Sequence, residues 1–338
     1  MMTDNDFADG LPEIFETYWR DRAVNGRLGI DDADDIWDFL NQLRIDAPSI
    51  LSDRTEPIFF RGQSRIDHAF SSSLYRLTKD NLQSGRQVTE RHLHLAEVAM
   101  MDAARSQGLG RRMSAQQLLC LMQHHLMPTR LIDVSRDPFE ALFFALNKDH
   151  DTDAVLFMIQ PLPVHESWHD SDAGPGSGKD ASAASVLPWA GLARGKTQAD
   201  GSWTNNVILI DIPTLDPRMQ AQSGVFLTGG LFRSYRVYYD DKRPGPGYNK
   251  GLRHGLSTDL SNLAIMWTKN FNFSQNSGFG ATGWVITIPS SLKRELLNRL
   301  RKEEGIYSDS MYPPVTEVSR LVKTEAGRLI KREDQEFG

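Results

Sequence analysis

The segment from Gln123 to Leu146, QHHLMPTRLIDVSRDPFEALFFAL, places charged and titratable side chains directly against one of the most apolar helices in the chain. Alternating β-branched residues in TRLIDVS predict a strand, and Asp137 followed by Pro138 is typical of a helix start. AVLFMIQ at 154–160 then predicts a continuous, buried strand. The buried stripe of the helix consists of Phe139, Leu142, Phe143 and Leu146. This segment therefore constrains the fold to contain a strand-helix-strand unit over residues 129–159.

Amphipathic patterns predict mainly helices before this unit and mainly strands after it. The helices are expected at 33–46, 85–108 and 114–125, with a further one at 290–306. Strands are expected at 58–60, 205–213, 223–230, 234–240 and 283–289. This order indicates an α+β fold, in which a helical first half packs on a mixed or antiparallel sheet, rather than a doubly wound parallel sheet. No glycine-rich dinucleotide fingerprint follows any of the strands.

The domain organisation follows from composition along the chain. Residues 1–34 form an acidic N-terminal segment, and residues 35–330 are expected to form one domain. A tract rich in Gly, Ser, Ala and Asp at about 161–206 predicts a flexible surface insertion within that domain. Residues 331–338 are expected to be a C-terminal tail.

Composition excludes few partners. The 338 residues are 40% hydrophobic and 24% charged, with a formal net charge of -6, which argues against binding nucleic acid or an anionic membrane by bulk attraction. A local basic patch leaves nucleic acid open as an acceptor. The single cysteine, Cys120, has no intramolecular partner for a disulfide, which fits a reducing compartment. Because no stretch reaches the length of a membrane span and MMTDNDFADG is unlike a signal peptide, we expect a cytoplasmic protein that does not span a membrane.

Familiar catalytic motifs are absent. Adjacent histidines such as His124 and His125 point about 100° apart on a helix, and neither HExxH nor a cysteine cluster is present, so no metal site is expected. We expect one of these histidines to satisfy the helix end and the other to line a pocket, where it can act in acid-base chemistry. Ser135 precedes a helix, where capping explains it, and neither GxSxG nor a P-loop occurs.

Two arginines are more informative. Arg61 follows a short apolar strand, and Arg130 lies in an otherwise apolar one. A guanidinium keeps its charge when buried, so it requires a fixed acceptor. One interpretation is an internal ion pair, for instance between Arg130 and Asp133. The other is an anion site, lined by both arginines, that takes a phosphate-bearing ligand.

Five stretches of the chain together resemble the FRG domain family, which is named for a Phe-Arg-Gly motif. They are FFRGQS at 59–64, SSSLYR at 71–76, the segment 123–146, RMQAQSGVFL at 218–227 and GIYSDSMYPPV at 305–315. In the family, the third stretch begins with a QHHGLPTRLLDWT-like run. This chain has Leu126-Met127 in place of the usual Gly-Leu, and Val134-Ser135 in place of Trp-Thr. The resemblance covers nearly the whole chain beyond about residue 35, so residues 35–330 are the expected FRG domain.

A weaker similarity connects the same order of motifs with the ADP-ribosyltransferases. It implies an ADP-ribosyltransferase-like core in which Arg61 faces the phosphates or ribose of NAD and Gln222 stands at the position of the catalytic glutamate. A neutral amide does not stabilise a developing cation as a carboxylate does, so Asp133 is the candidate replacement. The similarity implies catalytic roles for Asp133, Gln222 and His125, and NAD-binding roles for Arg61, Gln63, Arg130 and Ser135.

The resemblance leads to an expected function. We expect a bacterial effector that handles NAD as its substrate, either by ADP-ribosyl transfer to a macromolecule or by NAD hydrolysis, in phage defence or a toxin system. The alternative is a non-catalytic module that binds a nucleotide or a partner through the arginines. A third hypothesis is a nuclease or metal hydrolase that uses His124, His125 and Asp133, but the sequence has no metal-site motif.

Overall fold

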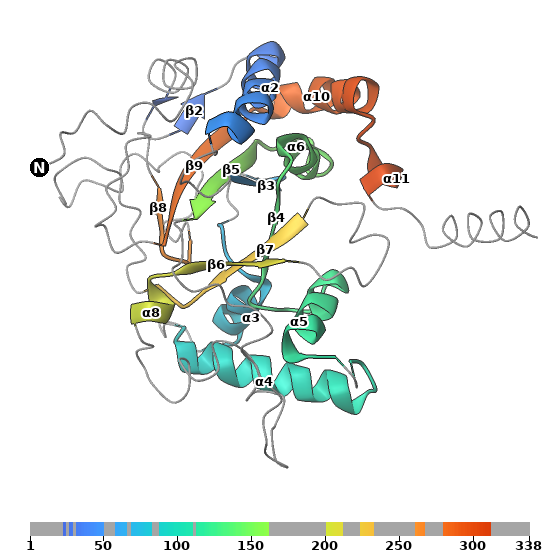
Figure 1. The fold of residues 1–338 in the computed structure, drawn as a ribbon. Coiled ribbons are helices and arrows are strands. Elements are labelled where there is room, and N and C mark those ends of the chain that lie inside the picture. Colours follow the sequence, from blue (N-terminus) through green and yellow to red (C-terminus); the bar gives the residue numbers. More distant parts are fainter. Residues whose placement is uncertain are drawn as a thin grey trace, which may run out of the picture.

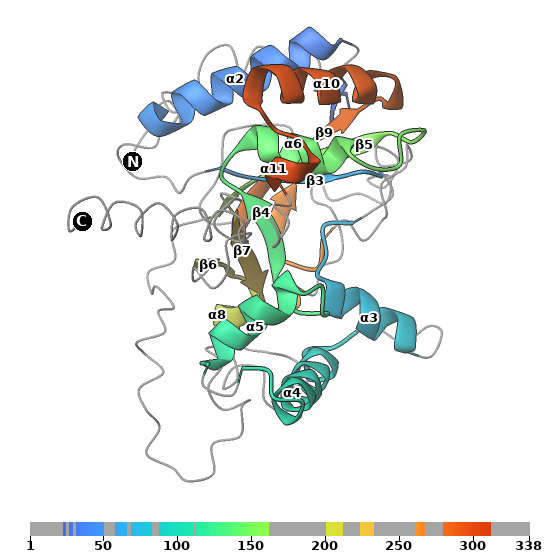
Figure 2. The same ribbon diagram turned by 90° about the vertical axis from the view of Figure 1, so that its right-hand side faces the viewer.

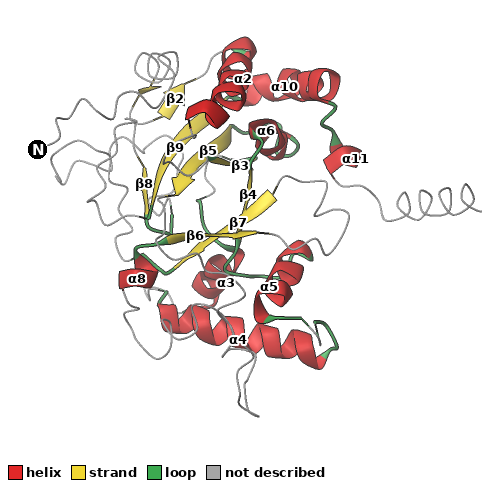
Figure 3. Ribbon diagram, in the orientation of Figure 1, coloured by secondary structure: helices red, strands yellow, loops and turns green. Residues whose placement is uncertain are grey.

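The structure is a computed structural model of the chain. It describes residues 23–24, 27–29, 32–50, 58–65, 69–82, 88–110, 113–161, 201–211, 224–232, 261–267 and 280–311. In this part, helices lie above and below a layer of strands (Figure 1). The assignment of helix and strand along the ribbon can be followed in Figure 3.

The described strands form one mixed sheet with the order β1-β2-β9-β5-β3-β4-β7-β6, and β8 pairs with β9 beside this path. Most neighbours are antiparallel, whereas β2 and β8 each run parallel to β9. The strands are β1 (Ala23–Val24), β2 (Arg27–Gly29), β3 (Phe59–Gln63), β4 (Ile132–Ser135), β5 (Ala154–Pro161), β6 (Val207–Asp211), β7 (Gly224–Gly229), β8 (Ile265–Trp267) and β9 (Ala281–Ile288). The α+β expectation is confirmed.

The sheet is weakly joined at its middle. On one side, β3 pairs with β5 along its whole length, from Phe59 opposite Ile159 to Gln63 opposite Val155. On the other side, β4 pairs with β7 throughout. Between these two ladders, β3 and β4 share the single aligned pair Phe60 and Ser135. The two halves of the sheet therefore part beyond this pair, next to Arg61.

Four helices cover the upper half in Figure 1: α2 (Ala33–Ile50), α6 (Pro138–Leu146), α10 (Lys293–Arg299) and α11 (Ser308–Met311). A 3-10 turn at Ser290–Leu292 precedes α10, and a π turn at Leu300–Glu304 continues it. Their apolar faces bury a core against β5 and β9, in which the rings of Trp37 and Phe139 lie 4.7 Å apart. The apolar face of α2, formed by Ile36, Phe39, Leu40 and Leu43, is buried in this core.

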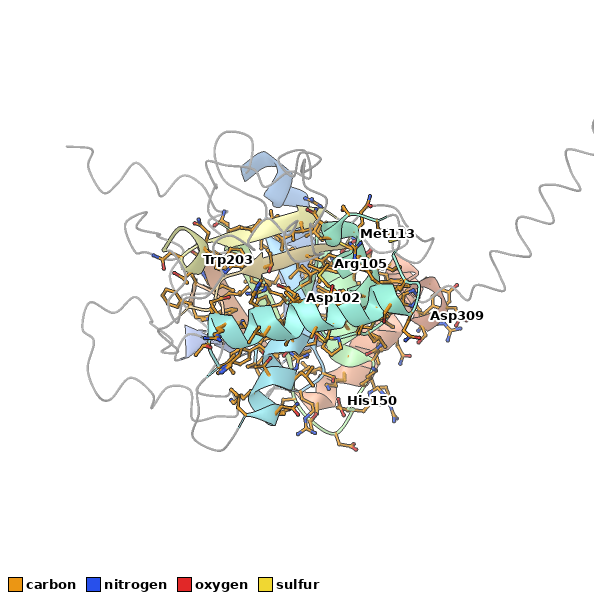
Figure 4. All side chains as sticks on the ribbon, turned by 90° about the horizontal axis from the view of Figure 1, so that it is seen from below. Asp102, Arg105, Met113, His150, Trp203 and Asp309 are labelled. Carbon is orange, nitrogen blue, oxygen red and sulfur yellow. The ribbon has the colours of Figure 1, made fainter. Side chains whose placement is uncertain are left out.

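The lower layer consists of α3 (Ser73–Asn81), α4 (Glu90–Ser106), α5 (Ala115–His124) and α8 (Gly201–Thr204), as Figure 2 shows from the side. Helix α5 begins with a capping box, in which the side chains of Ser114 and Gln117 each accept a hydrogen bond from the backbone amide of the other. Figure 4 looks at this layer from below, with α4 across the view. At the C-terminal end of α4, Arg105 donates a hydrogen bond to the carbonyl of Met113 at 3.3 Å.

The predicted strand-helix-strand unit is present as β4, α6 and β5, and α6 has the predicted Asp137 cap and Pro138 start. The two strands are not neighbours, because β3 lies between them and is antiparallel to both. Helix α6 therefore crosses over β3. At this crossing, a Cβ on Gly62 would lie 1.8 Å from the carbonyl oxygen of Ala141. The close approach of the two backbones requires glycine at this position.

Several elements were absent from the sequence-based prediction: the helices α3 and α11 and the short strands β1, β2 and β8. The strand expected at 234–240 and the tail at 331–338 lie outside the described residues, as do residues 162–200 of the expected insertion. The end of that tract differs from the surface loop we expected. Its residues 201–204 form α8, in which the large apolar ring of Trp203 is buried against α4 and α5.

Cys120 is buried in α5 as a free thiol. Among the described residues, no helix is both long enough and apolar enough to cross a bilayer.

Candidate functional site

Arg61 lies where the two halves of the sheet part. It sits on β3 opposite Phe157, one residue beyond the Phe60–Ser135 pair that joins β3 to β4. Its Nη1 donates a hydrogen bond to the backbone carbonyl of Asp133 at 2.6 Å. In a continuous ladder, a backbone amide of the neighbouring strand would satisfy such a carbonyl. The guanidinium therefore takes the place of a backbone donor at the split.

The charge of Arg61 is only partly compensated. Its side chain is 19% exposed, and its Nη1 lies 3.8 Å from Oδ2 of Asp133, which is too far for a hydrogen bond. Its buried Nε has no hydrogen-bond partner among the described residues. Burial lowers the pKa of Arg61; the charge of Asp133 works against this shift, and that of Arg76 adds to it. A partly buried arginine whose positive charge is incompletely compensated favours the binding of an additional anion.

A polar network holds the Asp133 carboxylate on the α5 side of β4. Gln123, near the end of α5, donates from Nε2 to Oδ2 of Asp133 at 2.6 Å and accepts at Oε1 from the hydroxyl of Thr129 at 2.6 Å. The backbone amide of Leu131 donates to the same hydroxyl at 3.1 Å, so the hydroxyl proton points to Gln123. The amide of Gln123 must then present its NH₂ to Asp133, which acts as an acceptor.

Asp133 itself is accessible. Its side chain is 60% exposed, although β4 as a whole is otherwise buried. The residue pairs with Phe226 of β7, whose ring belongs to the core under α4 and α5. Side chains alternate along a strand, so Asp133 projects on the α5 side of the sheet. A carboxylate that is both oriented and exposed can contact a ligand next to Arg61.

A second arginine, Arg76 on α3, belongs to the same surroundings. Its Nη1 donates to the backbone carbonyl of Ser71. Burial of the guanidinium lowers the pKa of Arg76, while the charges of Asp80 and Asp133 work against this shift. Asp133 thus interacts electrostatically with both Arg61 and Arg76.

Gln63 and Ser135, two of the expected NAD-binding residues, are engaged with the protein. Gln63 is buried, and its Nε2 donates to the carbonyl of Ala69 at 3.2 Å. The hydroxyl of Ser135 donates to Oε2 of Glu140 at 2.6 Å and accepts from the amide of Asp137 at 3.0 Å. Ser135 therefore has a structural role at the start of α6, although the N-cap itself is Asp137.

Arg130 is not part of the site, which corrects the expectation of a shared anion site with Arg61. Its side chain is 2% exposed and pairs with Glu90 at 3.0 Å and Glu97 at 3.3 Å. Its guanidinium also lies over the ring of Trp203, 5.6 Å from the centroid. The suggested pair with Asp133 is wrong, because two glutamates of α4 provide the negative charge that the buried guanidinium requires.

The remaining expected residues lie apart from this centre. His125 caps the C-terminus of α5 and is exposed, and within the described part of the chain no hydrogen bond or ion pair joins its ring to Arg61 or Asp133. Gln222 lies outside the described residues. Among the residues that the structure does describe, no three His, Cys, Asp or Glu side chains gather in a way that suits a metal ion.

Three residues of the site had no role in the sequence-based prediction: Gln123, Thr129 and Arg76. All three lie inside the stretches that carry the family resemblance, QHH, PTR and SLYR. The signal was therefore present as a motif, but the pairing of Gln123 with both Thr129 and Asp133 depends on how α5 meets β4.

Comparison with protein families matches this same region. Residues 56–154 match the family described as FRG domain. They contain β3, α3, α4, α5, β4, α6 and the first residue of β5. Residues 56–154 form an FRG domain. The match covers less than a third of the chain, so the similar stretches at 218–227 and 305–315 lie outside it. No curated protein and no solved structure matches the chain.

The geometry explains the motif that names the FRG domain. Phe60 points into the core under α2 and α6, while Arg61 points to the opposite face of β3. Gly62 returns to the α6 side, where the helix backbone leaves no room for a side chain. The three residues thus combine an anchor in the core, a positive charge at the split of the sheet and a close backbone crossing.

Proposed function

We propose that this FRG domain protein uses NAD as a substrate, cleaving the bond between nicotinamide and ribose and passing ADP-ribose to a macromolecule or to water. We also propose that it works in bacteria as an effector in phage defence or a toxin system. The observation that carries the proposal is the incompletely compensated Arg61 beside the exposed, oriented carboxylate of Asp133.

Arg61 would bind the phosphates of the dinucleotide. A planar guanidinium with unused donors suits a phosphate, and its permanent charge remains available at the split of the sheet. The carboxylate of Asp133 would face the ribose. When the C–N bond breaks, its electron pair leaves with nicotinamide, and positive charge develops on the ribose ring. A negative charge placed there lowers the barrier by several kcal/mol, on the order of oxyanion-type electrostatic effects.

The second step needs no further cofactor. Water, or a nucleophilic atom of an acceptor, attacks the ribosyl cation and releases a proton. Hydrolysis then gives ADP-ribose, and transfer gives an ADP-ribosylated acceptor. The order of the strands supports an ADP-ribosyltransferase-like core, because β3 with Arg61 neighbours β4 with Asp133, and β4 neighbours β7, which begins at Gly224, soon after Gln222.

An assay with purified protein and NAD labelled in the adenosine phosphate tests this proposal. Separation of nicotinamide, ADP-ribose and labelled macromolecules distinguishes hydrolysis from transfer. We expect Asp133→Asn to lower turnover about 100-fold or more, because a neutral amide loses the charge that stabilises the cation. Asp102→Asn is the matched control, since Asp102 is an exposed acid on α4 (Figure 4).

A non-catalytic binding module is the second candidate, and the neutral amide of Gln222 at the proposed glutamate position favours it. Such a module would bind NAD or another nucleotide and leave it intact. Full turnover in Asp133→Asn would contradict our assignment of this residue. Binding of NAD by the wild type without any turnover would favour the non-catalytic binding module over the enzyme.

Expression of wild type and Arg61→Gln in bacteria, with growth and cellular NAD followed over time, extends the test to the proposed effector role.

A further inference from the structure

The segment that leads into α3, residues 69–71, lies beside the face of β3 that carries Arg61. Gln63 is two residues beyond Arg61 and so shares its face, and its Nε2 donates to the first carbonyl of this segment at 3.2 Å. Phe157 is the cross-strand partner of Arg61, and its ring lies 5.4 Å from that of Phe70. The segment is thus fixed against β3 through Gln63 and against β5 through Phe157, the residue opposite Arg61.

Arg76 is attached to this same segment. Its Nη1 donates to the backbone carbonyl of Ser71 and lies 3.4 Å from the Ser71 hydroxyl. In the described part of the chain, no acceptor takes a hydrogen bond from the other guanidinium nitrogens, and the side chain is exposed. Arg76 therefore has a defined position and donors left for a ligand.

The start of α3 is also tied to the Asp133 network. The amide of Leu74 donates to the carbonyl of Thr129 at 3.0 Å, and the amide of Thr129 donates to the hydroxyl of Ser73 at 3.0 Å. The hydroxyl of Thr129 in turn bonds to Gln123, which holds Asp133. The helix carrying Arg76 and the strand carrying Asp133 are therefore held in one hydrogen-bonded unit.

The electrostatics agree with this geometry. Burial lowers the pKa of both Arg61 and Arg76, and the charge of Asp133 works against the shift at each. The charge of Arg76 also lowers the pKa of Arg61. Two like charges thus act on one another near a shared carboxylate, which Gln123 holds toward α5. A ligand with two adjacent negative groups would relieve this repulsion.

We propose that Arg61 and Arg76 together bind the two linked phosphates of a pyrophosphate group. The site would then select diphosphate-bearing nucleotides over monophosphates, with one guanidinium for each phosphate. This inference rests on the proposed function, because it names how the NAD site would hold its ligand. It also makes Arg76 a binding residue to which nothing in the sequence motifs assigned a role.

Calorimetric titration with inorganic pyrophosphate and with inorganic phosphate tests this inference. We expect wild type to bind pyrophosphate about tenfold or more tightly than phosphate, since each charge-assisted contact contributes roughly that factor. Arg76→Gln should remove the preference and leave phosphate binding within about threefold of wild type. Arg76→Lys should recover part of the preference, because the charge remains. Arg91→Gln, at an exposed arginine of α4, should behave as wild type.

The outcomes separate this inference from the proposed function. Equal affinity of wild type for the two anions, no pyrophosphate binding, or unchanged binding by Arg76→Gln would overturn the inference. Pyrophosphate preference that depends on Arg76, together with intact NAD after long incubation, would support it and refute the proposed catalysis. Arg76 is exposed as a residue, but its guanidinium is partly buried and bonded to the Ser71 carbonyl, so thermal unfolding of each variant establishes that it is folded.

Discussion

Leu126 adopts a left-handed backbone conformation, with φ of 59°, directly after α5. The side chain is 87% exposed and so buries little surface. A Cβ in this conformation clashes with its own backbone, at a cost of roughly 1–2 kcal/mol. The QHHGLPTRLLDWT-like run that the family resemblance implies has glycine at this position, and the left-handed φ angle of Leu126 is a conformation that glycine adopts without this cost.

At the residue scale we therefore predict that Leu126→Gly raises the free energy of unfolding by about 1 kcal/mol, because relief of this strain exceeds the added entropy of the unfolded chain. Urea unfolding measures the change. Leu95→Gly is the control, because Leu95 is an exposed leucine inside α4. Glycine in a helix interior should lower the free energy of unfolding by about 1 kcal/mol. Equal destabilisation by both substitutions would show that Leu126 is not strained.

At the element scale, the crossing of α6 over β3 sets the position of Arg61. We predict that Gly62→Ala lowers the free energy of unfolding by about 3 kcal/mol or more, because the added methyl meets backbone atoms of α6 that cannot move aside cheaply. Gly305→Ala is the matched control. Gly305 has φ of 66° with no atom within 4 Å of an added Cβ, so only its backbone conformation is penalised, at about 1 kcal/mol.

The contact between α4 and the segment just before β4 depends on a buried ionic cluster. Glu90 and Glu97 neutralise Arg130, and Glu90 also accepts a hydrogen bond from the amide of Leu231. We predict that Arg130→Met lowers the free energy of unfolding by about 3–5 kcal/mol, because two carboxylates then lie buried without their cation. Chemical unfolding measures this loss. In Arg130→Met/Glu97→Gln the second substitution should recover part of it, and an equal or larger loss in the double variant would contradict the role of the cluster.

The elements that sequence patterns predicted well have strong local signals. Caps and periodic apolar faces determine α5 and α6 almost to the residue. Helix α3 was missed because SLYRLTKDN buries only Leu74 and Tyr75, and the two- and three-residue strands β1, β2 and β8 depend on pairing with distant partners. Arg61 and Asp133 were found from their motif. The partners of Arg130 were not, because they lie more than thirty residues away on α4.

At the scale of the whole molecule, a ligand that binds at the split of the sheet should stabilise the fold. We predict that NAD or pyrophosphate raises the unfolding temperature of wild type. At a ligand concentration one hundred times the dissociation constant, the free energy of unfolding should rise by about 2.7 kcal/mol. Arg61→Gln should abolish the shift, while Arg91→Gln should keep it. Thermal unfolding at several ligand concentrations measures the effect. A shift that persists in Arg61→Gln would place the ligand elsewhere.

The central claim is that the partly compensated guanidinium of Arg61 binds the phosphates of NAD. Equilibrium dialysis of wild type, Arg61→Gln and Arg61→Lys against labelled NAD tests it most directly, with unfolding curves to establish that each variant is folded. We expect saturable binding by wild type, an affinity at least about tenfold lower in Arg61→Gln, and an intermediate affinity in Arg61→Lys. Absence of NAD binding by wild type, or equal affinity in all three folded proteins, would contradict it.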